Sequence, residues 1–206
     1  RNSIMYDLAA EVGIRSHDCK TVDVYFNGEY NGNYLLTEKV DIEETKVNIE
    51  NMQDRTEEAN PDIDIEKCPL AGDRSTNPGA RKYVDIPNNP EDITGGFILE
   101  FDFQDRYAEE ISGFVTNRGQ CVVVKEPEYA TKAQVDYIAD YFQHFEDALY
   151  SETGYNDLGK HYSEYCDVDS LARHYLLQEL ALNIDAAVTS FFFCKDSDLS
   201  ADSMMY

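Results

Sequence analysis

Two polar side chains stand where a helical pattern meets an aromatic run in the segment "LNIDAAVTSFFFCKD", residues 182–196. Asn183 and Asp185 follow the helical pattern, and three phenylalanines follow them at 191–193. A carboxylate on a short loop between two rigid elements can orient a hydroxyl group or accept its proton. The alternative is that Asp185 forms a turn, because aspartate is a common turn residue.

The spacing of the polar residues in this loop indicates one candidate reaction, phosphoryl transfer. Ser190 stands five residues after Asp185. In the catalytic loop of protein kinases, an aspartate orients the acceptor hydroxyl, and an asparagine five residues later binds magnesium. A serine hydroxyl can coordinate magnesium too, although more weakly than an amide carbonyl. Spacing alone leaves two interpretations open, a phosphoryl-transfer loop and an ordinary turn.

Other sets of reactive residues have no motif to support them. The sequence contains no Gly-rich phosphate loop, no G-x-S-x-G and no H-E-x-x-H. The five cysteines are far apart without a C-x-x-C, which argues against a zinc site and leaves one long-range disulfide as an alternative. The four histidines are scattered, and we interpret His144 and His174 as ordinary residues of helices.

The charge of the chain excludes several classes of partner. With 41 acidic and 17 basic residues, the net charge is −24. This balance argues against binding nucleic acid through its phosphates and against docking on anionic lipid. No apolar stretch is long enough for a membrane helix, so we expect no membrane insertion. The composition favours a soluble protein that works outside the cell or at high local concentration, and the start at Arg1 suggests a processed or excised piece.

The elements that must position the loop can be predicted from periodicity. Apolar spacing predicts helices over 2–12, 131–150 and 167–182, and Thr131 with Gln134 predicts a capping box. Asn27-Gly28 predicts a hairpin turn, and Gly32 predicts a bulge or a close approach to the backbone. Further strands are expected over 94–102, 119–128 and 190–195. We therefore expect an α+β domain, with a β-rich part over 1–128 followed by a helical part over 129–206.

Residues 41–93 differ from the rest of the β-rich part. They contain five of the six prolines, with fourteen acidic and six basic residues, and show no clear periodicity. This composition predicts an acidic, mobile surface excursion. A calcium loop built on "NPDIDIE" is the alternative, but its acids do not fit the EF-hand spacing.

Several segments together resemble the spore coat protein H (CotH) kinase-like family. They are "RNSIMYDLAAEVG", "VYFNGEYNGNYLLTEKVD", "GGFILEFD", "VVKEPE" and "LNIDAAVTSFFFCKD", in this order and over nearly the whole chain apart from the acidic excursion. The resemblance implies an atypical protein-kinase-like fold that binds ATP with Mg²⁺. Some members phosphorylate proteins outside the usual cytosolic setting, notably in bacterial spore coats, and many others are secreted bacterial proteins.

The resemblance also implies roles for individual residues. Asp185 looks like the catalytic-loop aspartate, Asn183 looks like its loop partner, and Ser190 takes the place of the metal-binding asparagine. Lys125, or else Lys39, resembles the lysine that pairs with the ATP phosphates. Glu100 would hold that lysine through an ion pair, as the kinase helix glutamate does. The alternative for Glu100 is a strand-edge charge, and at least one lysine must be an ordinary surface residue.

The chain departs from the family at its end. The resemblance implies that a W-D-F-D-like motif follows the "FFxxKD" strand and supplies the main metal ligand. The sequence ends at "ADSMMY", so we expect either an interior fragment of the domain or the product of a gene cut short. Two functions follow. The first is an extracytoplasmic kinase that acts on a secreted, coat or cell-surface protein or on a small molecule. The second is a non-catalytic, pseudokinase-like binding or structural module that is extracellular or coat-associated.

Overall fold

The computed structural model of the chain describes residues 2–186, 188–200 and 203–206. The chain divides into two compact units. The N-terminal unit comprises Arg1–Asp41 and Asp169–Ile184, and the sheet unit comprises Ile42–Val168 and Asp185–Tyr206. These units are defined by contacts, so they group the residues differently from the β-rich and helical parts expected from the order of predicted helices and strands.

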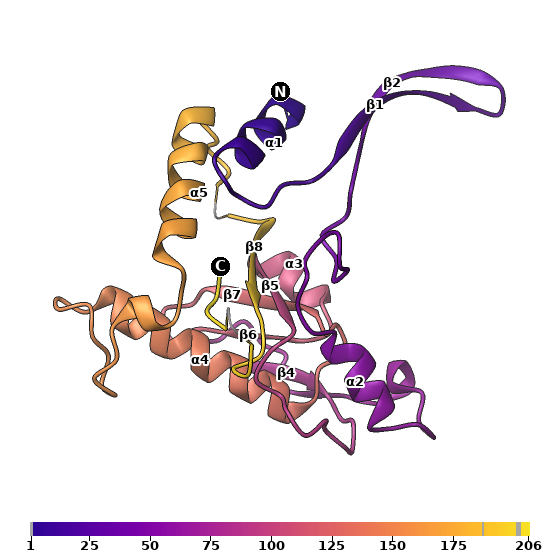
Figure 1. Cartoon of the computed structure of the whole chain (residues 1–206). Helices are drawn as coiled ribbons and strands as arrows, with labels where there is room; N and C mark the ends of the chain where they lie inside the picture. The colour runs from indigo at the N-terminus through magenta and orange to yellow at the C-terminus, as the bar shows by residue number, and fades with distance from the viewer. Residues whose placement is uncertain (1, 187, 201–202) are drawn as a thin grey trace. The chain divides into compact units, whose positions relative to one another are not determined.

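The N-terminal unit combines helices with one hairpin. Its elements are α1 (Asn2–Glu11), β1 (Cys19–Phe26), β2 (Glu29–Thr37) and nearly all of α5 (Val168–Ala181). The predicted hairpin is confirmed (Figure 1), since β1 and β2 pair antiparallel around Asn27 and Gly28, whose φ angles are 51° and 85°. Both values lie in the left-handed region that a type I′ turn requires. The register shifts next to Gly32, where the sequence predicts a bulge.

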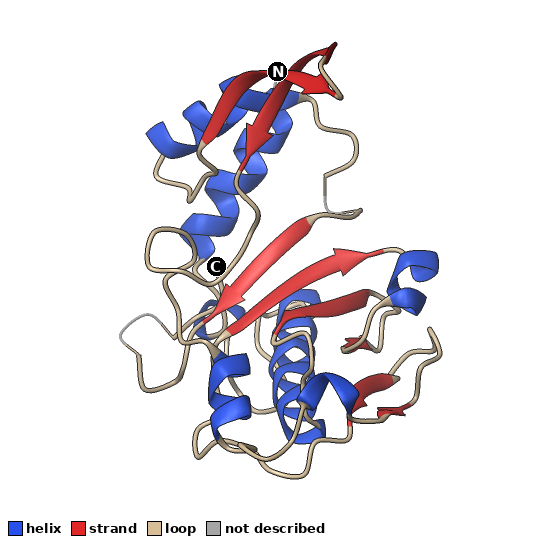
Figure 2. Cartoon of the chain, turned by 90° about the vertical axis from the view of Figure 1, so that its right-hand side faces the viewer, coloured by secondary structure: helices blue, strands red, loops and turns tan. Residues whose placement is uncertain are grey.

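The sheet unit is built on six antiparallel strands in the order β3-β4-β6-β7-β5-β8. Figure 2 draws the strands of the chain in red and its helices in blue. The strands are β3 (Leu70–Gly72), β4 (Arg81–Val84), β5 (Phe97–Asp102), β6 (Gly113–Val115), β7 (Cys121–Glu126) and β8 (Phe191–Lys195). The helices are α2 (Met52–Glu58), α3 (Gln104–Glu109), α4 (Lys132–Tyr150) and two 3₁₀ turns, η1 (Ile65–Lys67) and η2 (Tyr162–Glu164). The mixture confirms the α+β class.

Helix α4 packs on the sheet through an aromatic contact. The ring of Phe142 lies 5.8–5.9 Å from the rings of Phe101, Phe114 and Phe193, which come from β5, β6 and β8. The predicted capping box is present, because Thr131 and Gln134 each accept a backbone N–H of the other. Along α4, Val135, Ile138, Phe142 and Phe145 are buried, whereas Leu149 in the last turn is 51% exposed.

The expectation that residues 41–93 form a mobile acidic excursion is wrong for the span 52–86. This span contains α2, η1, β3 and β4, and the last two belong to the main sheet. Met52, Ile65 and Val84 are buried and enter the core, whereas Ile63 and Leu70 stay exposed. Buried Asn60 also ties α2 to the loop at Asn88, donating from Nδ2 to the Asn88 carbonyl and accepting from the Asn88 N–H. The acidic side chains of this span remain exposed, and their number made a short folded segment resemble a mobile one in composition.

Two further expectations concern cysteines and membranes. All five cysteines are free thiols, so the long-range disulfide left open by the sequence is not formed. None of the helices in the described ranges is long and apolar enough to cross a bilayer.

Candidate functional site

The loop before β8 is held by two buried acids of β5. Glu100 and Asp102 are 7% and 4% exposed. The Ser190 N–H donates to Glu100 Oε1 over 3.1 Å, and the Thr189 hydroxyl donates to Asp102 Oδ1 over 3.1 Å. Strand pairing explains this contact, because Phe101 of β5 lies opposite Phe191, the first residue of β8. The end of the predicted catalytic-type loop is therefore attached to β5, the strand next to β8 in the sheet.

Lys125 lies at a β-bulge in the neighbouring strand. Ile98 pairs with Glu126 and Leu99 pairs with Val124, so Lys125 has no residue opposite it in β5. A bulge of this kind changes the direction of a side chain and is common beside active sites. The ammonium Nζ lies 3.9 Å from Glu100 Oε2, and the lysine side chain is 35% exposed. Lys125, Glu100 and Ser190 therefore form one group in the sheet unit.

Burial and charge act in opposite directions on Glu100. Burial raises its pKa above the ordinary value, and the positive charge of Lys125 lowers it. Asp102 and Glu110 add negative charge nearby and raise the pKa further. The negative charge of the Glu100 carboxylate is therefore stabilised by the Lys125 ammonium and by the hydrogen bond from the Ser190 N–H.

The structure adds an acid that sequence reasoning missed. Glu110 follows α3, and its two carboxylate oxygens lie 3.1 and 3.3 Å from Lys125 Nζ. This is a closer ion pair than that of Glu100, so the lysine has two acidic partners. No motif marks Glu110, because its contact depends on the bulge in β7 and on the path of the chain after α3.

The remaining predicted residues lie at the other end of the loop or in the other unit. Asp185 is exposed in a turn, and its backbone carbonyl accepts the Val188 N–H over 3.2 Å. Asn183 belongs to the N-terminal unit, where its amide donates to Gln178 Oε1 over 2.7 Å. Lys39 is exposed in that same unit. Asn183 and Lys39 are therefore not placed relative to the group at Lys125.

Ser190 has an unusual backbone conformation. Its φ angle is 54°, in the left-handed region that residues with a β-carbon seldom occupy. Such strain persists only where the surroundings enforce it, and it concentrates at functional sites. Here the enforcing contacts are the Ser190 N–H to Glu100 and the strand that begins at Phe191.

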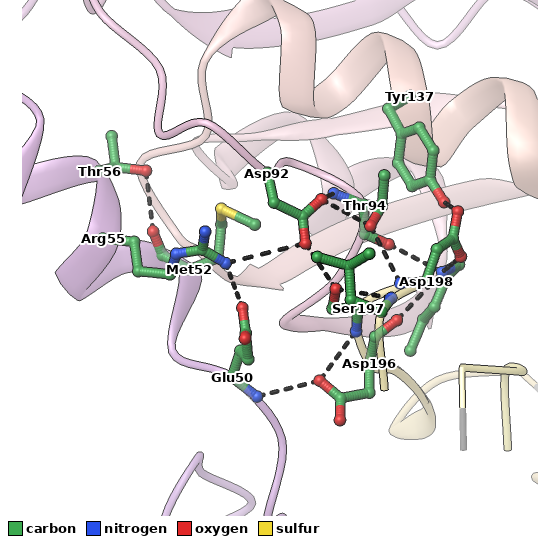
Figure 3. A network of polar contacts seen from close by, with 12 residues as sticks. Glu50, Met52, Arg55, Thr56, Asp92, Thr94, Tyr137, Asp196, Ser197 and Asp198 are labelled. Atoms are coloured by element: carbon green, nitrogen blue, oxygen red, sulfur yellow. Dashed lines mark hydrogen bonds and ion pairs between the residues drawn. The ribbon is translucent and has the colours of Figure 1, made fainter. Parts of the chain in front are cut away.

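A polar network holds the far end of β8 (Figure 3). Lys195 is fully buried, and its Nζ donates to the carbonyls of Thr94 and Asp196 and to Asp198 Oδ1 over 2.7, 3.1 and 2.8 Å. Asp92 accepts from Thr94 and from the Ser197 hydroxyl, which joins the loop before β5 to the turn after β8. Burial lowers the pKa of Lys195, and Asp198 opposes that effect. The strand that follows the loop is therefore fixed at both ends.

The polar side chains of Lys125, Ser190 and Asp185 suit a phosphate better than they suit a metal ion alone. An ammonium group such as that of Lys125 binds phosphate as a point charge. The Ser190 hydroxyl and the Asp185 carboxylate are oxygen donors, which Mg²⁺ prefers. In the described part of the chain, however, no three His, Cys, Asp or Glu side chains gather as a metal-binding group. Magnesium commonly takes one or two carboxylates and completes its shell with phosphates and water, so these residues fit a metal that arrives with a nucleotide.

The fold and this group of residues define an α+β domain in which a lysine–glutamate pair adjoins a loop with an exposed aspartate. A family model described as "CotH kinase protein" matches residues 1–201. The chain therefore belongs to the CotH kinase protein family. No curated protein and no solved structure matches the chain.

Proposed function

We propose that this chain is an atypical kinase-like domain that transfers a phosphoryl group from ATP, with Mg²⁺, to a secreted, spore-coat or cell-surface protein. The observation that carries the proposal is the grouping of Lys125, Glu100 and Ser190, because these residues come from three separate places in the sequence. Membership of the CotH kinase protein family supports the same class of reaction.

The proposed roles follow from the chemistry of each side chain. Lys125 binds phosphate oxygens, and the carboxylate of Glu100 keeps the ammonium near the loop. Asp185 orients the acceptor hydroxyl or accepts its proton, and Asn183 supports the loop. Ser190 contributes an oxygen ligand to Mg²⁺, which neutralises phosphate charge when it is bound. Lys39 remains the alternative phosphate ligand, although Lys125 has the contact with Glu100 that the role requires.

The test is binding and transfer by the full-length protein. Titration calorimetry with ATP and Mg²⁺ measures affinity, and labelled γ-phosphate measures transfer to surface proteins of the same organism. Lys125→Met should abolish most of the affinity while Lys39→Met retains it. Equal affinity of wild type and Lys125→Met would contradict the proposed site.

A second function, a non-catalytic binding module, is favoured by the exposed hairpin. Tyr25, Phe26 and Tyr30 near its turn are 63%, 71% and 59% exposed. Exposed aromatic side chains of this kind are common in protein-binding surfaces. This alternative would be established if the protein bound a secreted partner with the same affinity whether or not ATP is present, and neither bound nucleotide nor transferred its phosphate.

A further inference from the structure

The short segment that follows α3 is held by two basic side chains. Arg74 donates from Nη2 to the Glu110 carbonyl over 2.7 Å and from Nη1 to the Ile111 carbonyl over 3.0 Å. Lys82 donates from Nζ to the Tyr107 carbonyl. Arg74 thus satisfies two carbonyls that lie just past the last residue of α3, where no later helical N–H can bond them. The Tyr107 carbonyl also accepts the Glu110 N–H. The backbone of Glu110 is thus fixed from outside the helix.

The carboxylate of Glu110 uses this fixed position to contact Lys125. Both of its oxygens lie within 3.3 Å of Nζ, whereas the nearer oxygen of Glu100 is 3.9 Å away. Glu100 has another duty, because its Oε1 accepts the Ser190 N–H. The two acids therefore have different roles. Glu110 holds the Lys125 ammonium, and Glu100 connects the lysine to the loop through Ser190.

We propose that Glu110, with its backbone held by Arg74, is the residue that positions the Lys125 ammonium for the phosphates of a bound nucleotide. The inference rests on the proposed function and adds Glu110 and Arg74 to it as positioning residues. An ammonium has three N–H donors, so the two hydrogen bonds from Lys125 to the oxygens of Glu110 leave one donor for a phosphate oxygen. Holding the amine before the ligand arrives lowers the entropy that binding must offset.

The test compares the two acids with a matched control. Glu110→Gln removes the charge but keeps the shape, and Glu110→Asp keeps the charge. Glu109→Gln makes the same charge change at the adjacent, exposed position. Arg74→Lys keeps the charge but cannot grip two carbonyls with a planar fork. Melting temperatures of the full-length variants show whether each is folded.

The first measurement needs no nucleotide. Each variant is treated briefly with an amine-acylating reagent, and acylation of Lys125 is followed by peptide mass spectrometry. Lys125 should react faster in Glu110→Gln and Arg74→Lys than in wild type, because the amine is released. Glu109→Gln should match wild type, Glu110→Asp should lie near it, and Glu100→Gln should change the rate less than Glu110→Gln does. Equal rates in Glu110→Gln and Glu109→Gln would overturn the proposal.

The second measurement is affinity for ATP with Mg²⁺. Glu110→Gln should weaken binding about tenfold, the scale of one lost charge-assisted hydrogen bond, while Glu109→Gln does not. Tighter binding by Glu110→Gln would mean that this acid competes with phosphate, and would overturn the positioning role. If the wild-type protein binds no nucleotide, the proposed function is wrong, and so is the assignment of a phosphate ligand to Lys125. The acylation rates then decide separately which acid holds the amine.

Discussion

Lys82 offers a prediction whose size follows from its surroundings. The side chain in β4 is fully buried, and its Nζ donates to the Tyr107 carbonyl and lies 3.7 Å from the centre of the Tyr107 ring. Burial lowers the pKa of Lys82 from 10.5 to about 8, and the nearby Arg74 lowers it too, while Glu110 opposes both. The folded protein therefore binds this proton less tightly than the unfolded chain does.

The sign and size of the pH dependence follow from linkage. Between pH 8 and 10.5 the unfolded chain holds more protons at this lysine, so the lysine's contribution to stability rises as the pH rises through that window. The two pKa values give a destabilisation of about 3 kcal/mol near pH ~6.5 and about 1.4 kcal/mol near pH ~9.5. Lys82→Met removes the charge at similar length. Its stability relative to wild type should therefore fall by about 2 kcal/mol over this range.

Urea unfolding of both proteins at several pH values measures the difference. Half-buried Tyr137 and Tyr141 and buried Cys166, whose pKa values are raised by burial, contribute the same pH dependence to both proteins and therefore cancel in the comparison. Cys121 interacts with Lys82, so the comparison is repeated with Cys121→Ala in both proteins, where a similar slope is expected. A stability difference that stays constant with pH would refute the account of Lys82.

Three more predictions concern the loop, the sheet and α2. In the full-length protein, Asp185→Asn should lower phosphoryl transfer by about two orders of magnitude or more with an unchanged melting temperature, and an unaltered rate would remove this aspartate from the proposed site. Gly95→Ala should destabilise the fold severely in chemical unfolding, because its Cβ would lie 1.8 Å from a backbone nitrogen, whereas Gly119→Ala meets open space and should cost only the ~1–2 kcal/mol of a left-handed residue. Asn51→Ala should lower the free energy of unfolding by about 1 kcal/mol, since it removes the side-chain cap of α2, and no loss would show that α2 does not depend on this cap.

Local chemistry made the hairpin and α4 predictable from the sequence. Asn27-Gly28 tolerates the left-handed turn that the hairpin needs, and Thr131 with Gln134 satisfies the first N–H groups of α4. The strands β3 and β6 have three residues each, too few for an alternating pattern to be recognised. Their existence depends on pairing with β4 and β7, which is a property of the whole sheet.

The candidate site was predictable only in part. The pattern around Asp185 could be selected from residue types and spacing, whereas Lys125 and Glu100 were selected only through the resemblance to the CotH family, with Lys39 left open as the alternative lysine. The contact of Lys125 with Glu110 was not predictable, because it joins residues fifteen positions apart through a bulge. The roles of Asp185, Asn183, Lys39 and Ser190 in catalysis or binding stay predictions.

The bulge in β7 also bears on how relatives of this chain should be compared. An alignment matches residues by letter, yet one extra residue in a strand decides which face of the sheet each later side chain meets. A relative with a lysine before "EP" but without the extra residue would align with Lys125 and present its lysine to the opposite face. Assigning a nucleotide lysine by similarity in this family therefore requires the spacing from the β7 valines to Pro127 to be kept, as well as the lysine itself.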